Sequence, residues 1–100
     1  RLAAADLLAR FPADARAAAE RMIAGEESQA RRAADVLSRL QTPDALDRLG
    51  RLLDDPRKGV RLSALAGLAG RVPEAYLGRV QELTRDPDDL VRAAARAALR

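Results

Sequence analysis

The acidic cluster formed by Asp86, Asp88 and Asp89 is the first group in the sequence that could do chemistry. Carboxylates bind calcium, but these three lack the ligand spacing of a calcium-binding loop. Pro87 within the cluster marks a helix start, where the helix dipole favours negative charge. We therefore interpret the cluster as helix capping.

Nucleophilic and metal chemistry are limited by composition. The chain contains no histidine and no cysteine. Within it, this excludes Ser–His and Cys–His nucleophile systems, His-based metal sites and disulfides. The serine and threonine hydroxyls lie in no recognisable catalytic motif. We predict a protein that is not an enzyme, with no catalytic, cofactor-binding or metal-binding residues and no cofactor.

Asp55 and Arg61 belong to a motif that occurs twice in the chain. The pattern Asp-Pro-x-x-x-Val-Arg-x-x-Ala-x-x-x-Leu covers residues 55–68 and returns over 86–99. We refer to the interval from Asp55 to Asp86 as the motif period. A fixed period of this size is typical of stacked copies of one supersecondary unit, each burying its apolar face on its neighbours. A weaker copy, one motif period earlier, has three residues at the Val, Ala and Leu positions: Gln29, Ala33 and Leu37.

Helix breaks recur along the chain and define the elements that carry this motif. Proline follows a residue that can cap a helix at Thr42-Pro43, Asp55-Pro56 and Asp86-Pro87, and proline is tolerated at the first helical position. Gly25 and Gly70 lie where helices are expected to end. The predicted helices cover 2–11, 13–24, 27–40, 43–54, 56–70, 73–85 and 87–100.

These helices are expected to alternate between two types. The first type carries a stripe such as Leu46, Leu49 and Leu52, and the second carries Val-x-x-x-Ala-x-x-x-Leu. We predict an all-α, right-handed α-solenoid (α–α superhelix) of about three helix pairs plus one N-terminal helix. The expected units of this single domain, 1–100, are a partial unit 1–11 followed by 12–41, 42–71 and 72–100. Because neither end shows a polar cap, we interpret the chain as a fragment of a longer protein.

The composition agrees with a helical array. Hydrophobic residues make up 48% of the chain, mostly Ala and Leu, and aromatic residues only 2%, so the core must pack by close helix approach. Gly67 takes the repeat position of Val36 and Ala98 and is expected to allow such an approach. No apolar run reaches the roughly 20 residues that span a bilayer. The sequence leaves the cellular compartment open, with the cytoplasm favoured.

The repeated motif resembles HEAT repeats, specifically the short HEAT-like type found in phycobilisome lyases and many bacterial proteins. The resemblance covers nearly the whole chain and is strongest over 43–100. Longer HEAT and armadillo units run to about 40–47 residues, so the shorter motif period favours the short HEAT-like type. The tetratricopeptide and ankyrin families fit less well, because their signatures are absent. Bilin lyase activity is not expected, because nothing indicates a bilin pocket and fold analogy alone does not carry function.

The resemblance implies a specific contact at the inter-helix turns. HEAT repeats carry an Asp at this turn and an Arg six residues later, and these bond across neighbouring repeats as a ladder. The residues that fit are Asp55, Arg61, Asp86 and Arg92. One unit earlier both positions hold alanine, Ala24 and Ala30, as a paired interaction predicts, since a lone buried charge is costly. The alternative is an Asp that only caps and an Arg that only faces solvent.

The resemblance also implies that the second helices line a concave binding face. Helical spacing gives this face a small, apolar middle around Leu62, Leu65 and Ala66. Its expected rim consists of Arg31, Arg32, Arg96 and Arg100. We predict that this face binds a peptide or helix of a protein partner, with the leucines as anchors. The alternative is that both leucines pack on the next helix.

Two further functions remain open at this point. One is a nucleic-acid-binding module resembling the HEAT-like alkylpurine DNA glycosylases, and the other is an accessory domain of an enzyme elsewhere in the parent chain. Nucleic acid is the less favoured partner. The net charge is only +3, and neither Phe11 nor Tyr76 lies on the expected face to stack on a base. The partner's identity and the oligomeric state stay open.

Overall fold

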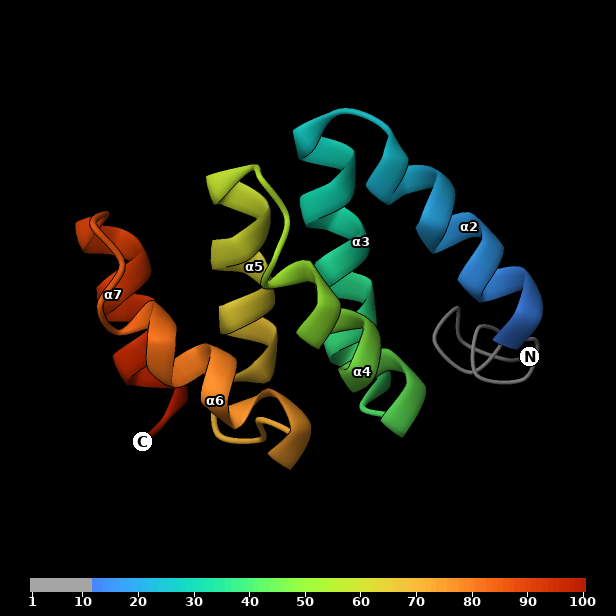
Figure 1. Ribbon diagram of the computed structural model, residues 1–100. Helices are drawn as coiled ribbons and strands as arrows, with labels where there is room; N and C mark the ends of the chain where they lie inside the picture. The colour runs from blue at the N-terminus through green and yellow to red at the C-terminus, as the bar shows by residue number, and fades with distance from the viewer. Residues whose placement is uncertain (1–11) are drawn as a thin grey trace.

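Helices make up nearly all of residues 12–100, the part of the chain that the computed structural model describes (Figure 1). They are α2 (Pro12–Ala24), α3 (Glu27–Leu40), α4 (Pro43–Leu52), α5 (Lys58–Leu68), α6 (Glu74–Leu83) and α7 (Asp89–Ala98). These residues form no strand, which confirms the all-α prediction for them. The predicted helix 2–11 lies outside the described residues. No helix from α2 to α7 is long and apolar enough to cross a membrane.

The helix starts follow the period of the sequence motif. The second helices α3, α5 and α7 begin at Glu27, Lys58 and Asp89, so each begins one motif period after the one before. The first helices α4 and α6 begin at Pro43 and Glu74, again one motif period apart. Each first helix packs against the second helix that follows it. The fold therefore repeats with the same period as the motif.

The start of α4 matches the capping signal in the sequence. Thr42 is the N-cap residue, and its hydroxyl accepts a hydrogen bond from the backbone N–H of Ala45 at 3.2 Å. Pro43 takes the first helical position, where its missing N–H removes no hydrogen bond. This predicted helix start is confirmed.

The two Asp-Pro pairs were expected to begin helices in the same way, and that expectation is wrong. Helix α5 begins only at Lys58, because the Asp55 carboxylate accepts from the backbone N–H of Arg57 at 2.9 Å and closes a short turn. Asp86 accepts in the same way from the N–H of Asp88 at 2.8 Å. Asp88 is then the N-cap of α7. The sequence signal is shared by both geometries, since Asp suits caps and turns alike.

The second helices lie side by side in a row, with α4 and α6 in front of them in Figure 1. Helix α3 packs along α5, and α5 packs along α7. Gly67 of α5 is buried at this contact, and a Cβ there would lie 2.9 Å from the Cβ of Ser38 and 3.1 Å from Cδ1 of Leu49. The predicted need for a small residue at this position is therefore confirmed.

Candidate functional site

The exposed side of α3 and α5 contains a hollow of about 210 Å³. Its lining residues are Arg31, Asp35, Ser38, Ser63, Ala66 and Gly67, and we refer to it as the α3–α5 hollow. Nε of Arg31 donates to the hydroxyl of Ser63 at 3.4 Å across the two helices. The structure thus brings together two of the residues predicted to bind a partner, Arg31 and Ala66. The lining of the hollow includes a guanidinium, a carboxylate, two hydroxyls and two small residues, Ala66 and Gly67.

The predicted leucine anchors are placed differently. Leu65 is 1% exposed and belongs to the hydrophobic core, so its prediction as a surface anchor is wrong. Leu62 is half-buried and packs against the same core. The physical reason is that α5 contacts α3, α4 and α7, which buries more of its circumference than a helix with one apolar stripe would bury. Both leucines therefore pack on the hydrophobic core and do not stand free as surface anchors.

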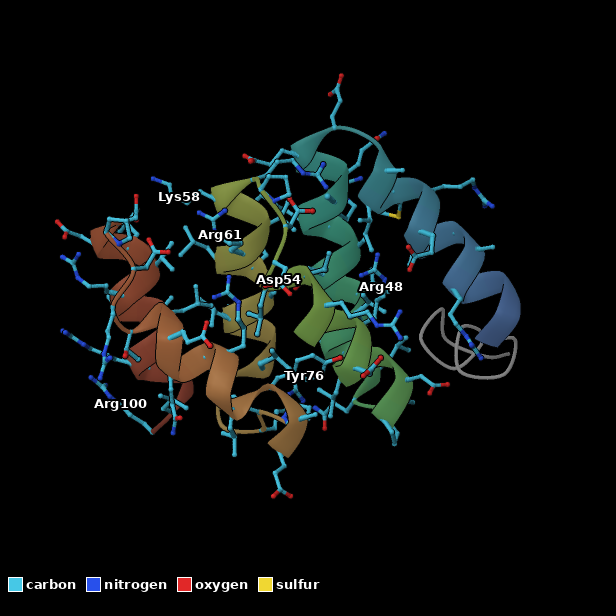
Figure 2. All side chains as sticks on the ribbon, in the orientation of Figure 1. Arg48, Asp54, Lys58, Arg61, Tyr76 and Arg100 are labelled. Carbon is cyan, nitrogen blue, oxygen red and sulfur yellow. The ribbon has the colours of Figure 1, made fainter. Side chains whose placement is uncertain are left out.

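The other predicted rim residues do not line the hollow. Arg32, Arg96 and Arg100 are exposed. Arg96 lies in the last turn of α7, where a cation is favoured by the helix dipole. Arg100 marks the end of the chain beyond α7 in Figure 2. These arginines add positive charge to the surface, but they do not line the hollow together with Arg31.

The prediction of a ladder between aspartate carboxylates and arginines is also wrong. The arginines donate to backbone carbonyl oxygens and not to the carboxylates of Asp55 and Asp86. Nη1 of Arg61 donates to the backbone carbonyls of Asp55 at 2.9 Å and Pro56 at 3.0 Å, within its own repeat. Arg92 repeats this geometry with the carbonyls of Asp86 at 2.9 Å and Pro87 at 3.1 Å. The turn leaves these carbonyls without helical partners, and each arginine folds back to satisfy them. The motif therefore closes the turn of one repeat and does not bond between repeats.

Arg57, which sequence reasoning missed, makes the contact between repeats. Its guanidinium pairs with both carboxylate oxygens of Asp55 at 2.9 Å. Its terminal nitrogens also donate to the backbone carbonyls of Ile23, at 2.8 Å, and Gly25, at 2.9 Å. The turn before α5 is thereby tied to the end of α2. The hydrogen bonds from Arg57 hold the pKa of Asp55 below its ordinary value.

The next pair of repeats is joined at the same position with reversed charge. Asp88 takes the place of Arg57, and its carboxylate lies 3.1 Å from Nζ of Lys58, labelled in Figure 2. This hydrogen bond lowers the pKa of Asp88. Positions 57 and 88 fall on the variable residues of the motif. The signal available in the sequence was that each differs in charge from its repeat counterpart and directly precedes a helix.

The first helices carry their own polar contacts. Arg48 of α4 binds Glu20 of α2 through two hydrogen bonds, which lower the pKa of that carboxyl. Tyr76 of α6 donates its hydroxyl to Asp47 at 2.6 Å, and this bond to a carboxylate raises the tyrosine's pKa. Figure 2 shows Arg48 and Tyr76 on the side of the molecule where α4 and α6 lie.

The described part of the chain holds no group of three or more Asp or Glu residues placed to bind a metal ion.

In comparisons with known proteins, a family model described as HEAT repeats matches residues 24–100. No curated protein and no solved structure gave a significant match. The matched range includes both copies of the motif and positions 57 and 88.

Proposed function

Because the chain belongs to the HEAT repeat family, we propose that it is a non-catalytic protein–protein interaction module. HEAT repeats commonly mediate such interactions, and repeat arrays present extended concave surfaces to their partners. In this proposal the second helices lie on the concave side of a right-handed solenoid. A peptide or helix of the partner binds across α3, α5 and α7.

The observation that carries this proposal is the α3–α5 hollow. Arg31 supplies donors and Asp35 an acceptor. The Ser38 hydroxyl donates to the backbone carbonyl of Asp35 at 2.7 Å and can still accept, while the Ser63 hydroxyl accepts from Arg31 and can still donate. A polypeptide backbone presents the complementary mixture of N–H and C=O groups. Ala66 adds little bulk, so a partner chain can approach the helix surface closely. The hollow therefore suits a polypeptide better than a ligand of single charge.

Peptides selected from a random display library against the full chain provide the test. We expect Ala66→Glu to weaken the selected peptides at least about tenfold, or about 1.4 kcal/mol, by filling the hollow with a charged side chain. Ala66 is exposed, so the fold should tolerate the change. Gln81→Glu, an equally exposed position on the first helix α6, is the matched control. Peptides that bind both variants as tightly as the unmodified chain would disprove the proposed surface.

A further inference from the structure

The space between α4 and α6 is filled by the ring of Tyr76. The ring lies directly against Gly50 of α4, where an added Cβ would collide with the ring carbons Cδ2, Cε2 and Cζ. The Tyr76 hydroxyl donates to Oδ1 of Asp47 at 2.6 Å. Figure 2 shows Tyr76 between the two helices. A small residue on α4 and an aromatic residue on α6 therefore complement one another at this junction.

One repeat earlier the same junction has no ring. At the positions one motif period before Tyr76, Gly50 and Asp47, the chain carries Ala45, Ala19 and Arg16. A pocket of about 400 Å³ lies there, between α2, α3 and α4. Its apolar lining includes Ala19, Val36, Leu37, Leu40 and Ala45. The pocket arises where the aromatic residue of the repeat is replaced by alanine.

The charges at the pocket are balanced. Nη2 of Arg16 lies 3.6 Å from Oδ2 of Asp44. Nη2 of Arg51 lies 3.2 Å from Oδ2 of Asp47, and Arg48 forms an ion pair with Glu20. All six of these residues line the pocket. Because each cation there has a carboxylate partner, neither an anion nor a cation gains an uncompensated charge on entering. The electrostatics favour an uncharged group.

The volume agrees with an aromatic ring. An apolar cavity of about 150 Å³ is enough to admit benzene. A pocket of about 400 Å³ accommodates a phenyl or phenol ring together with the atoms that link it to a backbone. The occupant one repeat later is itself a side chain on a helix. A ring presented by a polypeptide therefore fits the pocket in size, polarity and attachment.

We propose that this pocket binds the aromatic side chain, Phe or Tyr, of a partner polypeptide. The ring lies at the junction one repeat before Tyr76 but is displaced from the equivalent place, because Ala19 carries a Cβ where Gly50 has none. The pocket shares no residue with the α3–α5 hollow. The inference thus stands on a separate observation from the proposed second-helix surface. Either site can be disproved without the other.

The first experiment titrates p-cresol, the side chain of tyrosine, into the ¹⁵N-labelled full chain. We expect saturable amide shifts at Ala19, Leu40 and Ala45. A helical peptide with one exposed Tyr is then compared with the same peptide carrying Ala, and the Tyr peptide should bind at least about tenfold more tightly. Absence of saturable shifts at these residues, or equal binding of the two peptides, would overturn the proposal.

A variant that supplies the ring from within gives the second experiment. Ala45→Tyr combined with Ala19→Gly recreates the pair found at the next junction, Tyr76 and Gly50, and should abolish p-cresol binding. Ala97→Tyr, at an exposed position of α7, should leave it unchanged and is the control. Retained binding in the folded double variant contradicts the proposal. If circular dichroism shows that this variant does not fold, the shift mapping on the unmodified chain decides.

The chain's other aromatic residue, Phe11, lies outside the described residues, and a variant tests whether its ring competes for the pocket. Phe11→Ala is expected to leave p-cresol binding unchanged. Binding that appears only after Phe11→Ala would show that the pocket serves the chain's own ring and would overturn the assignment to a partner.

Discussion

At the scale of single residues, Arg57 connects the first two repeats more directly than any residue the motif singled out. It binds the Asp55 carboxylate with two nitrogens and donates to two backbone carbonyls at the end of α2. The side chain of Asp55 is only 11% exposed. Its negative charge has little contact with water and is stabilised by the hydrogen bonds from Arg57. Arg61 serves a different role, as a donor to its own turn.

A double-mutant cycle separates these two roles. Asp55→Ala should lower the free energy of unfolding by about 1–3 kcal/mol, since hydrogen bonds to a charged acceptor are lost. The coupling of Asp55→Ala with Arg57→Met should exceed its coupling with Arg61→Met, measured by urea denaturation. Equal couplings would mean that the ladder interpretation of Asp55 and Arg61 was closer to the truth.

The dependence of the unfolding free energy on acidic pH should reveal the contact between Asp55 and Arg57. The pKa values of Glu20, Asp55 and Asp88 are all lowered in the folded chain. Ionised carboxylates of this kind stabilise the fold above their unfolded pKa of about 4, and that stability is lost as the pH falls through the lower folded values. Between pH 6 and pH 3, Asp55→Asn should therefore lose less unfolding free energy than the unmodified chain. An identical acid dependence of the two proteins would remove Asp55 from the explanation.

At the scale of helices, the sequence predicted the elements better than their ends. The start of α4 followed from Thr42 and Pro43, because cap and proline act locally. The starts of α5 and α7 did not follow, since Asp-Pro serves equally for a cap and for the turn that precedes Lys58 and Asp89. The burial of Leu65 was missed for another reason: it depends on how many helices surround α5, which no single period encodes.

Two glycines test how closely the helices approach. Gly67→Ala should cost about 1–2 kcal/mol, because the new Cβ would lie 2.9 Å from the Cβ of Ser38 and overpacking exceeds the gain in helix propensity. Gly78→Ala is the control. It has nothing within 4 Å of the added Cβ, so this change should stabilise α6 by about 0.5–1 kcal/mol. Thermal denaturation of both variants gives the comparison, and equal shifts in the same direction would refute close packing at Gly67.

At the scale of the whole molecule, charge argues against a nucleic-acid partner. The chain carries 18 Lys and Arg against 15 Asp and Glu. Several of the arginines are already occupied by structural contacts, among them Arg48, Arg57, Arg61, Arg71 and Arg92. Tight binding to phosphates requires a stripe of uncompensated cations that release counterions. Within residues 12–100, the contacts just given withdraw these five arginines from any such stripe.

We therefore expect only weak binding to duplex or single-stranded oligonucleotides at near-physiological salt, with any residual binding falling steeply as salt is added. Fluorescence anisotropy titrations would measure this. Sub-micromolar binding that disappears on changing Arg31 and Arg32 to Ala would replace the polypeptide proposal with a nucleic-acid one.

The central claim is that a partner polypeptide binds on the second helices, and chemical-shift mapping tests it most directly. A display-selected peptide is titrated into the ¹⁵N-labelled full chain, and the shifted amides are located on the structure. We predict saturable shifts that concentrate on α3 and α5 around Arg31, Ser63 and Ala66. Saturable shifts confined to the first helices α4 and α6, with these three residues unchanged, would contradict the claim.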